Sequence, residues 1–477
     1  MSNQKTFVKD IADINTNFPQ WYTDVILKTE LVDYGPVKGT MVIRPYGFEI
    51  WEHIKKELDD RFKATGHKNA YFPMFIPYSY LVKEAEHVEG FAPEVALVTH
   101  IGDTPLEEKL VVRPTSETII CDMYAKWIKS YRDLPLLINQ WANVVRWEKT
   151  TRPFLRTSEF LWQEGHTLHQ TKEEAEKETL QMLEVYREFM QNVLAIDVLV
   201  GRKSQKEKFA GAVDTYSMEA MMLDGKSLQA GTSHYLGQNF AKAFKIQYLD
   251  KDGEIKNPYQ TSWGVSTRLI GALIMAHGDE RGLKLPPKVA PIQVVVITVA
   301  AHKEGVIEKV KEIRDQLIKA GIRCEMDDRD QSPGWKFNEW EMKGVPVRIE
   351  IGPRDIEKGE AVLVRRDTLE KTTLSLSKIT DVAKLLDDIA SNMYKQSKDH
   401  LAKNIVAASD MKQLKEVVDN KKFAKAMWCG CRECEDKIKE ETGATSRVIP
   451  FKEEKLGTKC VCCGKKAKHM IYFAKSY

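Results

Sequence analysis

The sequence predicts an α+β protein of three parts: a large domain of helices and strands, a small α/β domain, and a cysteine-rich C-terminal part that suits a metal site. The first part alternates amphipathic helices with strands that end in polar turns. A proline-rich linker at 286–291 is then followed by strands alternating with helices. Six of the eight cysteines lie beyond residue 428. We expect domain boundaries at 1–288, 289–400 and 401–477.

The composition is that of a globular protein without a general affinity for polyanions. Of the 477 residues, 43% are hydrophobic and 30% are charged, and the formal net charge is only +3. A nucleic-acid partner must therefore be bound by a local basic patch. The N-terminus has no apolar signal region, and no run of about 18 apolar residues occurs. We therefore expect a cytoplasmic protein with no membrane partner.

The first part opens with an amphipathic helix and an extended segment. We expect the helix from Tyr46 to Thr65, where apolar residues recur every fourth position before Gly66. An aromatic-rich strand is expected from Asn69 to Pro77, and Pro73 inside it indicates a sheet edge, a bulge or an interface. From the residues alone, an ordinary amphipathic helix with an edge strand explains this pattern as well as an interface does.

A second strand, which ends at Val112, leads into the polar turn Arg-Pro-Thr-Ser-Glu at 113–117. A helix from Thr118 to Lys129 follows. Thr, Ser and Glu at the start of a helix are typical of a capping box, and the same residues suit a ligand site. The residues leave both interpretations open.

The stretch 146–166, RWEKTTRPFLRTSEFLWQEGH, carries the strongest chemical signal. We expect two strands joined by a short polar turn at 149–153. The planar donors of an arginine guanidinium match phosphate oxygens. An arginine and an aromatic ring can stack on the two faces of a purine base. A nearby carboxylate can accept a hydrogen bond from the amino group of that base. The pattern thus indicates a nucleotide site on a sheet without a glycine-rich loop. The alternative is a surface hairpin with salt bridges. The residues of this pattern are Arg146, Glu148, Arg156, Phe160 and Glu164.

Later segments add a helix, a loop and a strand-to-helix junction. We expect a helix at 171–194, a strand at 196–200, and a loop of small and polar residues at 229–237. In the junction at 263–274, Gly264 permits close backbone approach. Arg268 enters an otherwise apolar helix, so its charge needs an anionic partner, either a ligand or a buried structural ion pair.

Three of these stretches, in order, resemble the three signature motifs of the class II aminoacyl-tRNA synthetases. The flanking sequences resemble the prolyl-tRNA synthetases of the archaeal/eukaryotic-like type over essentially the whole chain. They are RPTSET, LRTSEFLWQEGH, GTSHYLGQNF, GWKFNEWEMKGVPVR and the ending Lys-Ser-Tyr. The resemblance implies a class II antiparallel-sheet catalytic domain, an α/β anticodon-binding domain and a zinc-binding C-terminal domain. It also implies a homodimer, formed through the first motif.

The implied reaction attaches L-proline to tRNA(Pro) through prolyl-adenylate, with ATP and Mg²⁺. Arg146 and Arg268 are the expected catalytic residues. The resemblance implies ATP contacts at Arg146, Glu148, Arg156, Thr157, Phe160, Gln229, Thr232, Ser266 and Arg268. It implies a proline pocket of Thr115, Glu117, Arg146, Trp162, Glu164, His166 and His234, with Phe91 and Glu94 at its mouth. Arg152, in the turn, is expected to face the tRNA acceptor end.

Bacterial-type relatives carry a large editing domain between the second and third motifs. Only about 100 residues separate Glu164 from Gly264, so we expect no editing domain in this chain. In the second domain we expect anticodon contacts from Glu341, Arg348 and Arg354, near Trp335 and Lys336. For each of these residues a solvated charged face is an equal alternative.

The C-terminal cysteines form two pairs, Cys429-x4-Cys434 and Cys460-x2-Cys463, which is typical of structural zinc. Cys431 and Cys462 are possible substitutes, and redox or unligated cysteines are the alternative. The carboxylate of Tyr477 is expected to reach back toward the active site.

Two other functions fit parts of the pattern. A threonyl-type synthetase would need a catalytic zinc with Cys and His ligands, and Cys121 is the only cysteine before residue 290. A non-catalytic tRNA-binding paralogue would be expected to lose the motif arginines, which this sequence retains.

Overall fold

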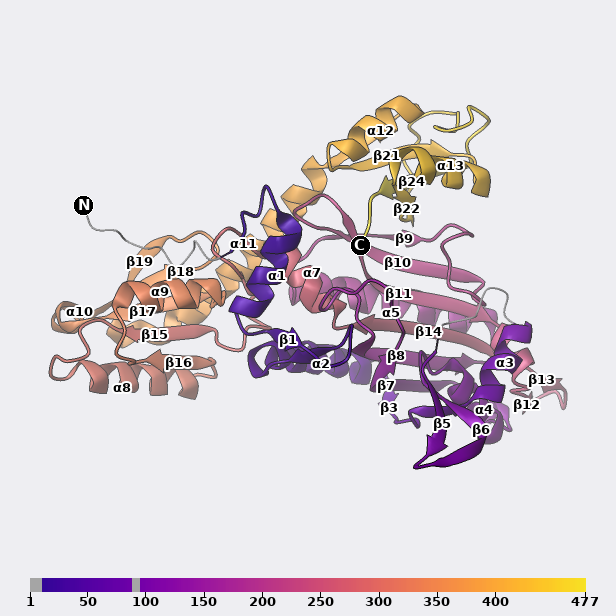
Figure 1. The fold of residues 1–477 in the computed structure, drawn as a ribbon, viewed down its shortest axis with the longest axis horizontal. Helices are drawn as coiled ribbons and strands as arrows, with labels where there is room; N and C mark the ends of the chain where they lie inside the picture. Colours follow the sequence, from indigo (N-terminus) through magenta and orange to yellow (C-terminus); the bar gives the residue numbers. More distant parts are fainter. Residues whose placement is uncertain (1–10, 88–94) are drawn as a thin grey trace.

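A computed structural model describes residues 11–87 and 95–477 (Figure 1). Its centre is an eight-stranded sheet of order β23-β9-β10-β11-β14-β8-β7-β3, antiparallel except for the β3–β7 pair. The strands of this sheet are β3 (Lys68–Asn69), β7 (Leu136–Val145), β8 (Glu159–His169), β9 (Val198–Arg202), β10 (Asp214–Met221), β11 (Ser227–Gly237), β14 (Tyr259–Ser266) and β23 (Ile449–Pro450). The predicted antiparallel-sheet domain is confirmed.

Helices cover one face of this sheet. The helix α5 (Lys172–Asn192) lies across the sheet, and Ser233 on β11 donates a hydrogen bond of 2.7 Å to the carbonyl of Thr179 in α5. Thr171 and Glu174 form the capping box that begins α5. The main core packs α1 (Phe18–Lys28), α2 (Pro45–Ala64) and α7 (Arg268–His277) with α5 and the sheet. The other face of the central strands is therefore left for a site.

Three predicted elements differ from the structure. The expected strand at 69–77 is two short strands, β3 and β4, in different sheets. The turn expected at 149–153 is a longer loop, 146–158, so Arg146, Glu148 and Arg156 lie outside strands. The loop expected at 229–237 is β11, a central strand, because its small residues pack closely rather than turn: a Cβ on Gly231 would lie 2.8 Å from Val265.

A smaller sheet flanks the main one, in the order β4-β6-β5. Its strands are β4 (Phe75–Pro77), β5 (Leu97–Ile101) and β6 (Thr104–Val112), with α3 (Tyr78–His87) and α4 (Glu117–Trp127) beside them. The remaining elements of this part are β1 (Val32–Tyr34), β2 (Met41–Ile43), α6 (Asn239–Ala243), β12 (Tyr248–Leu249) and β13 (Ile255–Lys256).

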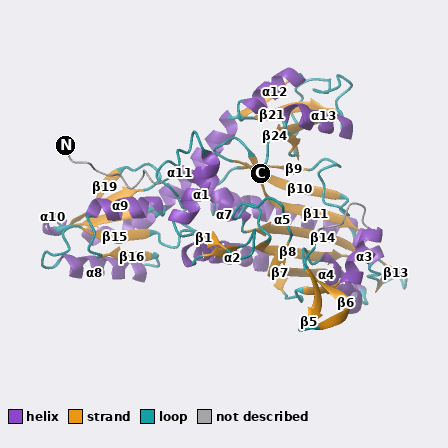
Figure 2. Ribbon diagram, in the orientation of Figure 1, coloured by secondary structure: helices purple, strands orange, loops and turns teal. Residues whose placement is uncertain are grey.

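After the proline-rich linker comes a five-stranded sheet with helices on both faces (Figure 2). All five residues of β15 are buried: Val294 and Val296 pack in one core, and Val295 and Ile297 pack with Trp340 in another. A strand buried on both faces explains the continuous apolar run. The elements are β15 (Val294–Thr298), α8 (Val306–Lys319), β16 (Cys324–Asp327), α9 (Pro333–Met342), β17 (Val347–Ile351), α10 (Pro353–Lys358), β18 (Glu360–Arg365), β19 (Lys371–Ser375) and α11 (Val382–Lys403).

The last part is a four-stranded sheet of order β20-β21-β24-β22. Its elements are β20 (Ile405–Ala408), α12 (Met411–Asp419), β21 (Phe423–Trp428), α13 (Arg432–Thr442), β22 (Thr445–Ser446) and β24 (His469–Ala474). In Figure 1 this part lies beside β9. The five-stranded sheet lies at the other end of the molecule. Among the helices that the structure describes, none has the length and apolarity needed to cross a bilayer.

Candidate active site

A cavity of about 280 Å³ opens on the face of the central sheet that α5 leaves free. Side chains at every second position of β8 line it, as a strand requires: Phe160, Trp162, Glu164 and His166. Residues predicted from distant parts of the sequence join them. They are Thr115, Glu117, Arg146, Gln229, Thr232, His234, Ser266 and Arg268.

A β-bulge brings Gln229 to this face. In the β10–β11 ladder Met218 pairs with Gly231 and Glu219 with Gln229, so Ala230 is an extra residue on β11. A bulge reverses the alternation of side chains along a strand. Gln229 therefore shares the cavity face with Thr232 and His234, while Ser233 faces α5.

Two lining arginines, Arg146 and Arg268, make one end of the cavity strongly cationic. The Arg146 guanidinium lies 5.5 Å from the Phe160 ring centre and 5.2 Å from that of Trp162. Arg268 donates a hydrogen bond of 3.1 Å to the carbonyl of Leu155, and within the described residues it has no carboxylate within 4.0 Å. Burial, with the positive charges of Arg156 and Arg146, lowers the pKa of Arg268 to about 10. An anion between these groups would relieve the repulsion.

The other end of the cavity holds a buried Glu–His pair. Glu164 accepts hydrogen bonds from Ser116 at 2.5 Å and from Gln140 at 2.9 Å, and it contacts Nε2 of His166 at 2.9 Å. Burial would raise the pKa of Glu164, but these hydrogen bonds and the His166 charge outweigh burial and lower it. Burial would lower the pKa of His166, and the Glu164 partner instead raises it. The pair is therefore held in its charged form.

His234 beside this pair is neutral. Its ring nitrogens contact the hydroxyls of Thr215 at 2.9 Å and Thr232 at 3.0 Å, and its ring lies 4.8 Å from that of Phe209. Burial, with the charge of His166, lowers its pKa to about 3. Two further polar atoms that are buried here, Nε1 of Trp162 and Oγ of Ser262, have no partner among the described residues. Unpaired buried groups facing a cavity are what a polar ligand would satisfy.

Nine lining residues were not among the predicted site residues: Glu207, Phe209, Thr215, Ala230, Gly231, Ser262, Trp263, Gly264 and Val265. Thr215 lies on β10, which we did not predict. Phe209 directly follows the basic segment at 201–208, and an aromatic residue there was the available signal.

Three predicted nucleotide residues lie outside the cavity lining. Glu148 and Arg156 form an ion pair of 3.3 Å in the loop 146–158, and Thr157 is buried and donates to the carbonyl of Glu159 at 2.7 Å. The predicted mouth residues Phe91 and Glu94 lie outside the described residues.

A second cavity, of about 620 Å³, lies against this loop and is lined by Glu148, Arg152, Arg156 and Tyr477 among others. The Tyr477 hydroxyl donates to Asp224 at 2.7 Å. The C-terminal residue thus lies beside the loop, and the predicted approach of its carboxylate to the active site stays a prediction.

The predicted anticodon residues differ in their accessibility. Glu341 accepts from Arg348 at 2.7 Å and from Arg281 at 2.8 Å, and the Arg348 guanidinium lies 4.2 Å from the ring of Phe337. Both Glu341 and Arg348 are thus committed to a largely buried ionic network. Arg354, on α10, is exposed.

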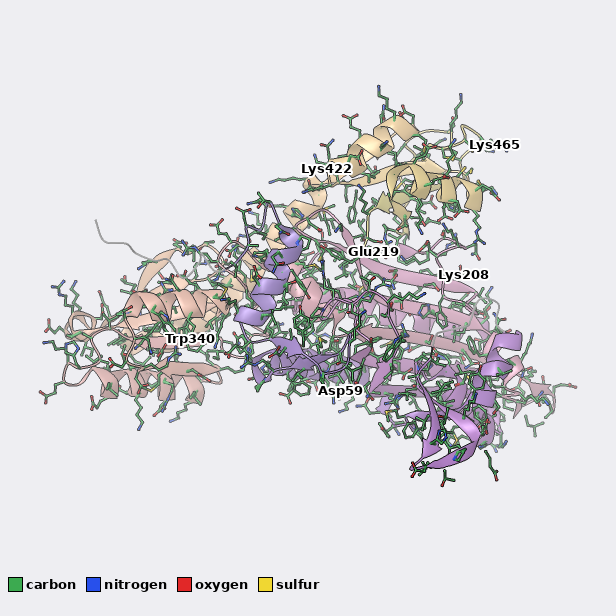
Figure 3. The ribbon with its side chains drawn as sticks, in the orientation of Figure 1. Asp59, Lys208, Glu219, Trp340, Lys422 and Lys465 are labelled. Atoms are coloured by element: carbon green, nitrogen blue, oxygen red, sulfur yellow. The ribbon has the colours of Figure 1, made fainter. Side chains whose placement is uncertain are left out.

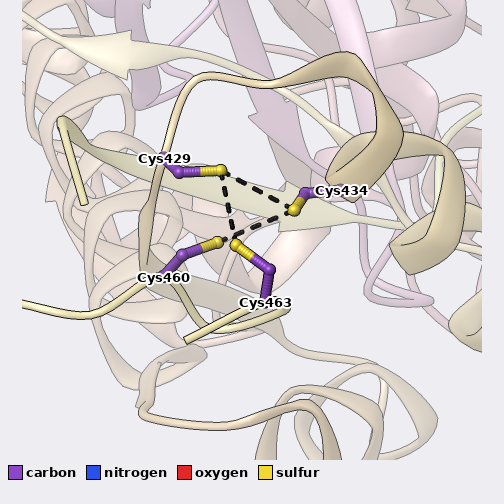
Figure 4. Close-up of side chains that lie close together, drawn as sticks. All are labelled: Cys429, Cys434, Cys460 and Cys463. Carbon is purple, nitrogen blue, oxygen red and sulfur yellow. Dashed lines mark hydrogen bonds between the residues drawn. The ribbon is translucent and has the colours of Figure 1, made fainter. Parts of the chain in front are cut away.

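Four cysteine sulfurs, those of Cys429, Cys434, Cys460 and Cys463, meet at the C-terminal sheet (Figure 4). All four lie within 4.8 Å of one another, and the contacts Cys429–Cys434, Cys434–Cys460 and Cys429–Cys463 are 3.6, 3.9 and 3.8 Å. Zinc–sulfur bonds of about 2.3 Å in a tetrahedron require sulfur separations of about 3.8 Å. The donor set therefore fits a tetrahedral thiolate site. Cys431 and Cys462 are not members of this set.

An antiparallel sheet that presents motif arginines from a hairpin and from the start of α7 to one cavity defines a class II aminoacyl-tRNA synthetase. The chain matches the class II tRNA synthetase core domain (G, H, P, S and T) over residues 99–277. It also matches an anticodon binding domain over 293–385 and the prolyl-tRNA synthetase C-terminal domain over 411–477.

Curated relatives agree over the full length. The proline--tRNA ligase of Alkaliphilus oremlandii is 63% identical over 477 residues, 99% of each chain. Proline--tRNA ligase 2 of Clostridioides difficile is 60% identical over 478 residues, 100% of this chain and 99% of that protein. The chain therefore belongs to the prolyl-tRNA synthetase family, as predicted, and the threonyl alternative is not supported. These relatives are bacterial, so they do not bear out the archaeal/eukaryotic-like type that we expected.

Proposed function

We propose that this protein attaches L-proline to tRNA(Pro) in the cytoplasm, by ATP-dependent formation of prolyl-adenylate and transfer to the tRNA 3′ end. One observation carries the proposal: a single cavity joins an arginine cluster to a pocket containing a Glu–His pair and an aromatic wall. The first end suits a polyphosphate, and the second suits a compact amino acid with a cationic nitrogen.

In the nucleotide end, Arg146 and Arg268 bind the phosphates, and Phe160 stacks on adenine. Gln229 and Thr232 present oxygen atoms, the ligands that Mg²⁺ prefers, so the donor set fits the ion. Magnesium would supply charge neutralisation on the phosphates. Arg146 also borders the proline pocket, which places it where charge develops on the α-phosphate.

In the amino-acid end, Glu117 and the Glu164–His166 pair face the imino nitrogen, and Trp162 and Phe209 flank the ring. The proline carboxylate attacks the α-phosphorus and pyrophosphate leaves, so no protein nucleophile is required. Catalysis consists of positioning and of stabilising the charge that develops.

Three structural features extend the proposal. The enzyme does not edit in cis; in support, residues 170–258 are largely used by α5, three strands of the central sheet, α6 and a small hairpin. The four cysteines hold structural zinc, which ties the end of β21 to the start of α13. A homodimer forms through the small sheet and the segment that precedes it, where Ile101 on β5 is 69% and Tyr71, between β3 and β4, is 71% exposed.

Pyrophosphate exchange measured with proline, threonine, alanine and cysteine tests the activity. Exchange that depends on proline is expected. Exchange with threonine instead would favour a threonyl-type enzyme, and no exchange with any of the four would favour a non-catalytic tRNA-binding protein.

A further inference from the structure

The C-terminal domain is built into the catalytic sheet rather than tethered to it. Its strand β23 supplies the outer strand, since Ile449 pairs with Arg202 and Pro450 with Gly201 on β9. A Cβ on Gly201 would lie 2.2 Å from the Ile449 carbonyl, so only glycine allows this approach. The chain end returns to β11, where the backbone N–H of Ser227 donates to Lys475 at 2.8 Å and its carbonyl accepts from Tyr477 at 3.1 Å.

Between these two connections lies a buried ionic cluster centred on Glu219, a residue of β10 with no exposed surface (Figure 3). Glu219 accepts hydrogen bonds from Lys203 at 2.7 Å and from Arg447, a C-terminal residue, at 2.9 and 3.1 Å. Ser217 and Ser227 donate to it at 2.8 and 2.7 Å. Every donor to this carboxylate is itself buried.

The cluster adjoins the nucleotide end of the active-site cavity without lining it. Glu219 pairs across the ladder with Gln229, at the bulge that turns Gln229 toward the cavity. Ser217 and Thr215 alternate with Glu219 along β10, and Thr215 lines the cavity, so the carboxylate lies on the same face. Burial lowers the pKa of Arg268, and the charge of Glu219 acts in the opposite direction. Glu219 is therefore within electrostatic reach of Arg268.

The carboxylate depends on its C-terminal partner. Burial would raise the pKa of Glu219, but the charges of Lys203 and Arg447 outweigh it and lower the pKa to about 2. Removing one partner of a buried charge leaves the remaining charges poorly compensated. Loss of Arg447 would thus disturb the position of Glu219, the Ser227 hydrogen bond and, two residues further along β11, Gln229.

We propose that Glu219 and Arg447 are positioning residues for ATP, through which the C-terminal domain sets the affinity of the catalytic domain for the nucleotide. Arg447 holds Glu219 against β11, and Glu219 fixes the bulge that presents Gln229. The negative charge of Glu219 also lowers the electrostatic potential at Arg268. The inference rests on the proposed synthetase activity and deepens it. Proline binding, at the opposite end of the cavity, should be affected much less.

Steady-state pyrophosphate exchange on the full chain tests this, with the KM values for ATP and proline measured separately. Arg447→Met is expected to raise the KM for ATP about tenfold, a typical interdomain coupling, and the KM for proline by less than about twofold. Arg447→Lys keeps the charge and should recover most of the ATP affinity.

Asp436→Asn is the matched control. It removes another ion pair between the same two parts, Lys206–Asp436 at 2.7 Å, whose aspartate is 54% exposed. Both KM values should stay at wild-type level. If Arg447→Met raises both KM values equally, or lowers only thermal stability, the role is merely structural and the inference is overturned.

If Arg447→Met does not fold, Ser227→Ala provides the test of the inference. This variant removes one hydrogen-bond donor to Glu219 and leaves the side chains of the C-terminal domain unchanged. A selective rise in the KM for ATP supports the inference, and unchanged KM values overturn it. Wild-type protein without proline-dependent exchange would instead overturn the proposed function, and this inference with it. Active wild-type protein with unaffected variants would overturn the inference alone.

Discussion

The guanidinium of Arg366 donates to both carboxylate oxygens of Asp279, at 2.9 and 2.6 Å. Asp279 lies two residues beyond the end of α7, the helix that begins at Arg268, and Arg366 directly follows β18. This pair therefore joins the helix that carries a cavity arginine to the five-stranded sheet. Arg281 extends the connection by donating to Glu341 at 2.8 Å.

The Asp279–Arg366 pair should be visible in the acid stability of the protein. Burial would raise the pKa of Asp279, but the hydrogen bonds and charge of Arg366, with the charge of Lys284, lower it to about 2. A folded pKa below the unfolded value near 3.8 stabilises the protein above about pH 4, and this stability is lost as the pH falls toward 2. Between pH 4 and pH 2 the free energy of unfolding of the wild-type protein should therefore fall by about 2 kcal/mol more than that of Asp279→Asn. Urea unfolding at a series of pH values checks this, and identical pH profiles would contradict it.

Glu164 should control the titration of His166. Because Glu164 is the group that raises the pKa of His166 against burial, Glu164→Gln should bring that pKa below 6.5. The stabilising charge on His166, present in the wild type below about pH 6.5 and lost as the pH rises through the folded pKa, then disappears. Histidine NMR titration measures the change. Glu178→Gln, on α5 beside His67, is the control and should leave His166 as it is.

The cysteine geometry predicts which thiolates bind the proposed zinc. Cys434→Ser and Cys460→Ser should abolish binding of one zinc per chain, because each removes one of four converging thiolates. Cys462→Ser should retain the zinc. Elemental analysis of purified protein, together with the thermal midpoint before and after chelation, provides the measurement. Zinc lost from Cys462→Ser but retained in Cys434→Ser would contradict the assignment.

The exposed apolar side chains of the small sheet should form the dimer interface. Phe75 on β4 and Leu97 on β5 are both more than a third exposed, although each lies on a strand that pairs with β6 in the small sheet. Phe75→Glu places a charge in the interface and should convert the dimer to a monomer in light scattering. Ile318→Glu, on α8 of the five-stranded sheet, alters an equally exposed apolar residue and should leave the dimer intact.

Periodic elements were predictable from the sequence, and long-range pairings were not. The helix α5 follows from its apolar spacing and capping box, and β15 follows from its continuous apolar run, because both patterns result from local burial. The strand β23 could not be predicted, because two residues, Ile449 and Pro450, pair with a strand about 250 positions earlier. Likewise the sequence shows the charges of Glu341 and Arg348, but it does not show that Arg281 neutralises Glu341.

The lining residues that belong to a sequence motif were predictable, whereas those placed by packing were not. The residues of β8 alternate as the sequence suggests, so all four of its predicted side chains reach the cavity. Gln229 was assigned from the resemblance to known synthetases, but its strand was taken for a loop. Ala230 and Gly231 break the alternation of polar and apolar residues that would indicate a strand. Ala230 is the extra residue of the bulge, and Gly231 leaves room for the side chains of Met218 and Val265.

Arg146 and Arg152 should separate amino-acid activation from transfer to tRNA. The Arg146 guanidinium lies over the rings of Phe160 and Trp162, where the proposed mechanism places the α-phosphate. Arg146→Ala should reduce proline-dependent exchange by about 10²–10³-fold, the typical cost of losing a preorganised donor, and leave tRNA binding largely intact. Arg152 lines the separate cavity beside the loop 146–158, so Arg152→Ala should leave exchange intact and slow aminoacylation of tRNA. Exchange and aminoacylation rates measured on both variants check this, and equal effects on both reactions would contradict the division of the loop between two substrates.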